Sequence, residues 1–183
     1  MRRLALLGAL SAGLVFTGAP AGLAGSGSFS DPRNDLDPGA ASDTARYDIV
    51  RATEGHARGG RLVHTVTVAG QIANPASSEV PLLYIEDTAA DAPNGTSTCR
   101  YFVGRHEGRL GVFKCGYGDR VASARIRRTS SSTVRYEFKE RAIGSPDSYR
   151  WAFVTRGPTN GTTSILDRLP SGDNFAFLTH ELR

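Results

Sequence analysis

The chain has 183 residues, of which 39% are hydrophobic, and its 22 basic and 18 acidic residues give a formal net charge of +4. A charge this small gives no reason to expect a nucleic-acid-binding protein. The first 24 residues are a predicted leader, and its removal leaves 159 of the 183 residues. Residues 25–183 are enough for one domain with a substantial core.

Residues 1–24 have the three parts of a secretory signal peptide: Arg2 and Arg3, an apolar run over 4–16, then small residues. The run is shorter than the roughly 20 residues that a membrane-spanning helix needs, so cleavage is favoured over an uncleaved anchor. The preference for arginine over lysine is typical of a GC-rich bacterium. We expect a secreted bacterial protein with no transmembrane anchor after cleavage.

An aspartate-rich segment follows a short lead over 25–30 that is expected to be flexible. Carboxylate oxygens are the ligands that calcium prefers, although the spacing is not that of an EF-hand. The segment predicts a calcium site with four ligands, Asp31, Asp35, Asp37 and Asp48. A second acidic group could join the same site: Glu86, Asp87 and Asp91. The alternative is a polar loop in which the aspartates form Asx turns.

Apolar and polar residues alternate with a period of two through most of the remaining chain, which indicates β-strands separated by turn-forming residues. The pattern predicts about eight or nine strands, at 48–55, 61–70, 81–88, 99–105, 111–117, 121–128, 133–141, 148–156 and 174–182. The segments 144–149 and 156–164 are predicted loops. We expect an all-β protein, an antiparallel β-sandwich of immunoglobulin-like or jelly-roll-like type.

Two cysteines, Cys99 and Cys115, flank a predicted turn near Glu107. In an exported protein such a pair predicts a disulfide, worth roughly 3 kcal/mol for a loop of this length. If paired residues have numbers that sum to 214, Cys99 lies opposite Cys115 and Tyr101 lies opposite Phe113. The alternatives, a catalytic thiol or a metal pair, lack a C-x-x-C spacing.

The next hairpin is expected to turn at 129–132, with alternate residues of 133–139 buried. Its first strand contains an arginine cluster, residues 124–128, which could contact a polyanion or a membrane surface. The alternative is a solvated strand face whose arginines are balanced by Glu137 and Glu140.

Tyr149, Trp151 and Phe153 lie on one face of the strand over 148–156. Such a row can stack sugar rings, which makes Tyr149 and Trp151 the candidate ligand-binding residues. The alternative is that the row fills the core.

No motif for a nucleophile with its base, a zinc cage or a phosphate loop is found, and no catalytic residue is predicted. The four histidines are scattered, and His64, on the apolar side of its strand, is expected to be structural. Glu86 and Asp87 are neighbours on a strand, so they point to opposite faces and do not suit a catalytic pair. We expect a protein that is not an enzyme.

The stretches "DPRND", "YDIVRATEG", "GGRLVHTVTVAG", "LLYIEDT" and "DRLPSGD" resemble secreted sandwich domains of carbohydrate-binding module family 9 and DOMON-like domains. The resemblance implies a β-sandwich and an association with sugar or haem binding. We expect a secreted, non-catalytic binding domain that recognises polysaccharide or another cell-exterior ligand, with structural calcium. The alternatives are an inert structural or protein-interaction domain of the bacterial envelope, and a hydrolase with an unrecognised site.

Overall fold

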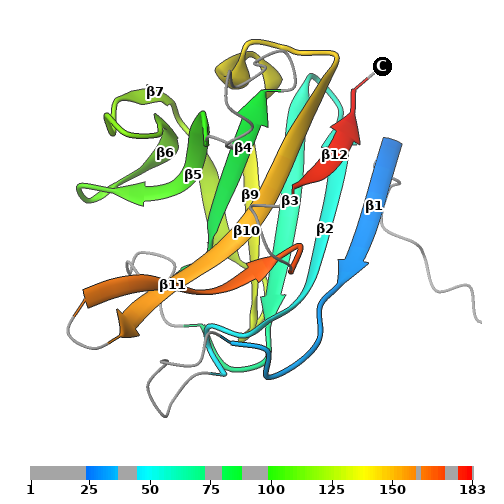
Figure 1. Ribbon diagram of the computed structural model, residues 1–183. Helices are drawn as coiled ribbons and strands as arrows, with labels where there is room; N and C mark the ends of the chain where they lie inside the picture. The colour runs from blue at the N-terminus through cyan, green and yellow to red at the C-terminus, as the bar shows by residue number, and fades with distance from the viewer. Residues whose placement is uncertain are drawn as a thin grey trace, which may run out of the picture.

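The computed structural model describes residues 24–36, 45–72, 80–87, 99–159, 162–171 and 177–182. This part of the chain forms two antiparallel β-sheets that pack face to face (Figure 1). It contains no α-helix, and nothing in it qualifies as a membrane-crossing helix. The predicted fold class, an all-β sandwich, is confirmed. The predicted signal peptide lies outside the described residues except for its last residue, Ala24.

The first sheet has five strands in the order β1-β2-β3-β9-β8. Their bounds are Ala24–Ser30, Ile49–Ala57, Arg61–Val68, Thr133–Lys139 and Arg125–Arg128. The second sheet has seven strands, six of them in the order β11-β10-β4-β5-β6-β7, with β12 also paired to β10. Their bounds are Thr162–Leu169, Ser148–Thr159, Leu82–Asp87, Tyr101–His106, Arg109–Lys114, Arg120–Ala122 and Leu178–Glu181. A short 3-10 helix, η1 (Glu140–Ile143), precedes β10.

The described residues form twelve strands where about eight or nine were expected. The segment 121–128 is divided into β7 and β8, and the predicted loop 156–164 is mostly strand, the end of β10 and the start of β11. The prediction that residues 25–30 form a flexible lead is also wrong, because these residues belong to β1. β1 pairs with the edge of β2, and Phe29 packs edge-on against Trp151 at 5.5 Å between ring centroids.

The cysteines are joined as predicted, with 5.8 Å between the Cα atoms of Cys99 and Cys115. The predicted register of this hairpin is wrong by one residue, since Tyr101 pairs with Lys114 and Phe102 with Phe113. The cause is the two-residue turn Glu107-Gly108, in which both residues have positive φ, 48° and 79°, as a type I′ turn requires. A two-residue turn makes paired numbers sum to 215, so the cysteines are diagonal neighbours.

The following hairpin agrees with the prediction. β8 and β9 are joined through 129–132, and Val134, Tyr136 and Phe138 of β9 are buried while the residues between them are not. With apolar side chains from β2, β3, β4, β5, β6 and β10, these residues form one core between the two sheets.

Candidate metal site

Three aspartates converge where β1 ends and β11 passes close to the start of β2. Asp31, Asp35 and Asp167 each offer a carboxylate oxygen, and these oxygens all lie within 4.8 Å of one another. In Figure 1, β11 lies at the end of the sandwich where the chain leaves β1 and enters β2. The group therefore bridges the N-terminal segment and the second sheet.

The loop that carries Asp31 and Asp35 is held by backbone contacts. The Asp31 amide donates to the carbonyl of Val50, 3.2 Å away, which continues the β1–β2 pairing by one residue. Asn34 adopts the left-handed conformation, with φ of 62°, and its amide donates to Oδ2 of Asp48 at 3.0 Å. Asp48 thus fixes the turn that brings Asp35 back towards Asp31.

Asp167 reaches the group because β11 is bulged. Thr155 pairs with Asp167 and Arg156 pairs with Ile165, so Leu166 is an extra residue in β11. A bulge of this kind changes the direction in which neighbouring side chains point, and Leu166 and Asp167 are both buried although they are adjacent. The Asp167 carboxylate accepts hydrogen bonds from the amides of Ile49, at 2.5 Å, and Arg168, at 2.6 Å.

The clustered carboxylates disfavour one another's charge. Burial raises the pKa of Asp31 to about 6, against the lowering effect of a hydrogen bond from Ser171, and Asp35 and Asp48 raise it further. Burial likewise raises the pKa of Asp167 to about 7, although two backbone amides stabilise its charged form. A bound cation would remove this repulsion.

Two oxygens at the site have no hydrogen-bond partner among the described residues: Oδ2 of Asp31 and Oδ1 of Asp48. Asp31 is 9% exposed and Asp48 is 1% exposed, so bulk water does not satisfy these acceptors fully. A donor set made only of carboxylate oxygens suits a hard cation such as calcium, which takes six to eight oxygens at about 2.3–2.6 Å.

The structure brings together part of the predicted ligand set. Asp31 and Asp35 belong to the group, whereas Asp48 lies beside it and holds the loop through Asn34. Asp37, like Asp91 of the second acidic group, lies outside the described residues. Asp167 was missed because only the β10–β11 hairpin brings it to the N-terminal segment. The one sequence feature that drew attention to Asp167 was its place in "DRLPSGD", one of the stretches that carry the family resemblance.

The proposal that the second acidic group joins the site is wrong for Glu86, because its carboxylate lies 2% exposed opposite Arg150 on β10 and forms an ion pair with it. It does not belong to the aspartate group of the described residues.

Tyr149 and Trp151 do not form an exposed ligand platform. Both side chains are 0% exposed, because the face of β10 that carries them is turned towards the five-stranded sheet. The indole N–H of Trp151 donates to Glu54 of β2, and His180 of β12 lies 3.1 Å from the other carboxylate oxygen of Glu54. The core interpretation of this aromatic row is confirmed.

His64 is structural, as expected. It is fully buried, its Nε2 lies 2.7 Å from the hydroxyl oxygen of Tyr149, and its ring meets Trp151 edge-on. Burial, followed by the proximity of His180, lowers its pKa to about 3, so the ring is neutral in the folded protein.

Comparisons with protein-family models, curated proteins and solved structures gave no match to this chain. The resemblance to carbohydrate-binding module family 9 and DOMON-like domains therefore stays a prediction.

Proposed function

We propose that this chain is an exported, non-catalytic β-sandwich domain that binds a calcium ion through Asp31, Asp35 and Asp167. The observation that carries the proposal is the convergence of three carboxylates within 4.8 Å, one of which, Asp31, has a buried oxygen without a partner. Clusters of aspartates are common in proteins that bind no ion, so the cluster alone would not carry the proposal. A buried acceptor left without a donor is costly, and a cation would satisfy it.

The ion would be structural. Asp31 and Asp35 belong to the segment after β1, whereas Asp167 belongs to β11 in the other sheet. A calcium ion held by all three would tie the N-terminal strand to the body of the sandwich. Because the ion would bind the folded chain and not the unfolded one, it would raise stability by mass action, by about 2.7 kcal/mol at one hundred times its Kd.

The expected location outside the cell has support from the Cys99–Cys115 bridge, since disulfides persist in oxidising compartments. A role without catalysis has support from the use of the histidines: His64 and His180 are buried in the core network, and His56 lies 3.5 Å from Glu140. Polysaccharide or an envelope protein is the proposed partner of such a domain.

A thermal melt in calcium and in EDTA tests the proposal. We expect a Tm in 1 mM calcium several degrees above that in EDTA, and no difference for the double variant Asp35→Ala with Asp167→Ala. Asp119→Ala removes an exposed aspartate from the turn between β6 and β7 and should keep the full calcium response. Equal Tm values for the wild type in both solutions would overturn the calcium site.

A further inference from the structure

The outer face of the five-stranded sheet carries an excess of positive charge. In its five described strands, the residues that point away from the core include one acidic side chain, Glu137, and six basic ones. The basic residues are Arg51, Arg61, Arg125, Arg127, Arg135 and Lys139. Six minus one gives this face a net charge of +5, whereas the whole chain carries +4. The face is therefore more basic than the chain as a whole.

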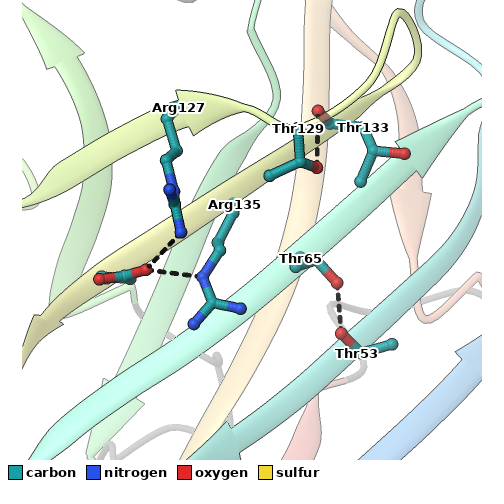
Figure 2. A network of polar contacts seen from close by, with 7 residues as sticks. Thr53, Thr65, Arg127, Thr129, Thr133 and Arg135 are labelled. Atoms are coloured by element: carbon teal, nitrogen blue, oxygen red, sulfur yellow. Dashed lines mark hydrogen bonds and ion pairs between the residues drawn. The ribbon is translucent and has the colours of Figure 1, made fainter. Parts of the chain in front are cut away.

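The arginines at the centre of this basic face are held in place by Glu137. Its Oε1 accepts a hydrogen bond from Nε of Arg135 at 2.6 Å and one from Nη2 of Arg127 at 3.4 Å (Figure 2). A guanidinium group has five N–H donors in a fixed plane, so one contact to Glu137 leaves each arginine able to bind a second anion. Glu137 thus fixes two arginines while neutralising only one charge.

Hydroxyl groups continue the same face across β3 and β2. Thr53, Thr65, Arg135 and Arg127 lie in register on four neighbouring strands, and adjacent strands are about 4.8 Å apart, so the row is roughly 14 Å long. The Thr53 and Thr65 hydroxyls are hydrogen-bonded to each other, as Figure 2 shows. Those of Thr67 and Thr133 in the next row are 3.1 Å apart.

The chemistry of the basic face favours one kind of occupant. In the described part of the chain, the exposed large apolar side chains are Tyr117 and Val121, both beyond β6 in the other sheet. The basic face therefore offers no apolar wedge for a bilayer and no aromatic side chain on which nucleic-acid bases stack. Flat rows of guanidinium and hydroxyl groups instead match a polymer that carries both anionic groups and hydroxyls.

We propose that the outer face of the five-stranded sheet binds an anionic polysaccharide, with Arg125, Arg127 and Arg135 contacting its carboxylate or sulfate groups and the threonines contacting its hydroxyls. The inference rests on the proposed binding function, because it names the ligand class, but it does not depend on the calcium site. It also argues against the alternative hypothesis that 124–128 is only a solvated strand face with balanced arginines. Glu137 offsets one of the six positive charges on this face.

Heparin, polygalacturonate and neutral dextran are the probes, sulfated, carboxylated and uncharged respectively. We expect the full mature protein in EDTA to bind heparin or polygalacturonate, to release it at high salt because the contacts are ionic, and not to bind dextran. Arg127→Gln with Arg135→Gln should weaken binding at least tenfold. Arg109→Gln with Arg120→Gln removes the same charge from the other sheet and should change the affinity less than twofold.

The single variant Arg125→Gln tests the same face and leaves the two arginines that donate hydrogen bonds to Glu137 unchanged. It should weaken binding about threefold. Equal loss in the matched pairs of variants, binding to anionic phospholipid vesicles but to neither polysaccharide, or no binding to either polysaccharide would overturn the proposal. Asp35→Ala with Asp167→Ala separates the two proposals, because it should lose the calcium response and still bind the polysaccharide.

Discussion

The backbone amide of Ile49 donates a 2.5 Å hydrogen bond to the carboxylate of Asp167, 118 residues further along the chain. This bond joins the first residue of β2 in one sheet to β11 in the other. Asp167 also belongs to the group with Asp31 and Asp35, so the same side chain takes part in a contact between the sheets and in the candidate metal site.

Asp35→Asn tests whether the three carboxylates repel one another. Asp35 is exposed and raises the pKa of both Asp31 and Asp167, after the larger effect of burial. In EDTA at pH 8 the variant should be more stable than the wild type by about 0.5 kcal/mol, the order of an exposed charge pair. In calcium the wild type should be more stable than the variant. Urea unfolding followed by circular dichroism measures both, and a variant less stable than the wild type in EDTA would count against the repulsion.

Trp151→Phe tests the bond between the sheets at Glu54. The variant removes the indole N–H that Glu54 accepts, so a buried carboxylate loses one of its donors. Hydrogen bonds to charged groups contribute about 1.5–3 kcal/mol, and we expect a loss of at least that size in the free energy of unfolding. A double-mutant cycle with Glu54→Gln should give a coupling of similar size. Additive effects of the two substitutions would mean that the contact contributes nothing.

Because the pKa of His64 is lowered in the folded chain, we expect the protein to lose stability in acid. Its pKa is about 3 in the folded chain, chiefly because of burial, and about 6.5 in the unfolded one, where the ring is free to take up a proton. Between pH 3 and 6.5 the unfolded chain therefore binds more protons at this site, so stability rises with pH across that window and is lost on acidification.

The measurement is the pH dependence of the free energy of unfolding for the wild type and for His64→Gln. The slope of the wild type should exceed that of the variant by up to about 1.4 kcal/mol per pH unit between pH 4 and 6. Parallel curves for the wild type and His64→Gln would show that His64 takes up its proton equally in both states.

The disulfide should contribute about 3 kcal/mol, because Cys99 and Cys115 are 16 residues apart and the bridge restricts the unfolded chain. Cys99→Ser with Cys115→Ser should lower the free energy of unfolding by that amount in urea. A thiol assay on the unreduced, denatured wild type should find no free thiol. Two reactive thiols per chain would rule the bridge out.

Local sequence patterns were sufficient for the β8–β9 hairpin, its buried face and the disulfide. The alternation of Val134, Tyr136 and Phe138 predicted which side of β9 is buried, and the cysteine spacing predicted the bridge. β1 was missed because a glycine- and serine-rich segment has little strand propensity of its own. Gly27 suits that strand since a Cβ there would lie 2.8 Å from the ring of Phe29. Pairing with β2 is what makes the segment a strand.

The candidate site was only half predictable for a related reason. Asp31 and Asp35 are close in sequence, and their oxygen-donor chemistry was visible there. Asp167 depends on a bulge at Leu166 and on the pairing of β11 with β10, which are features of tertiary structure. The one-residue error in the β5–β6 register has a similar cause, since a two-residue and a three-residue turn at Glu107 leave nearly the same alternation in the sequence.

Titration calorimetry of calcium into the metal-free mature protein tests the central claim most directly. The structure predicts one ion bound per chain, and an affinity at least a hundredfold weaker for Asp35→Ala with Asp167→Ala, whereas Asp119→Ala binds as the wild type does. Absence of calcium binding by the wild type, or equal binding by the Asp35 and Asp167 double variant, would contradict the assignment of these carboxylates as a calcium site.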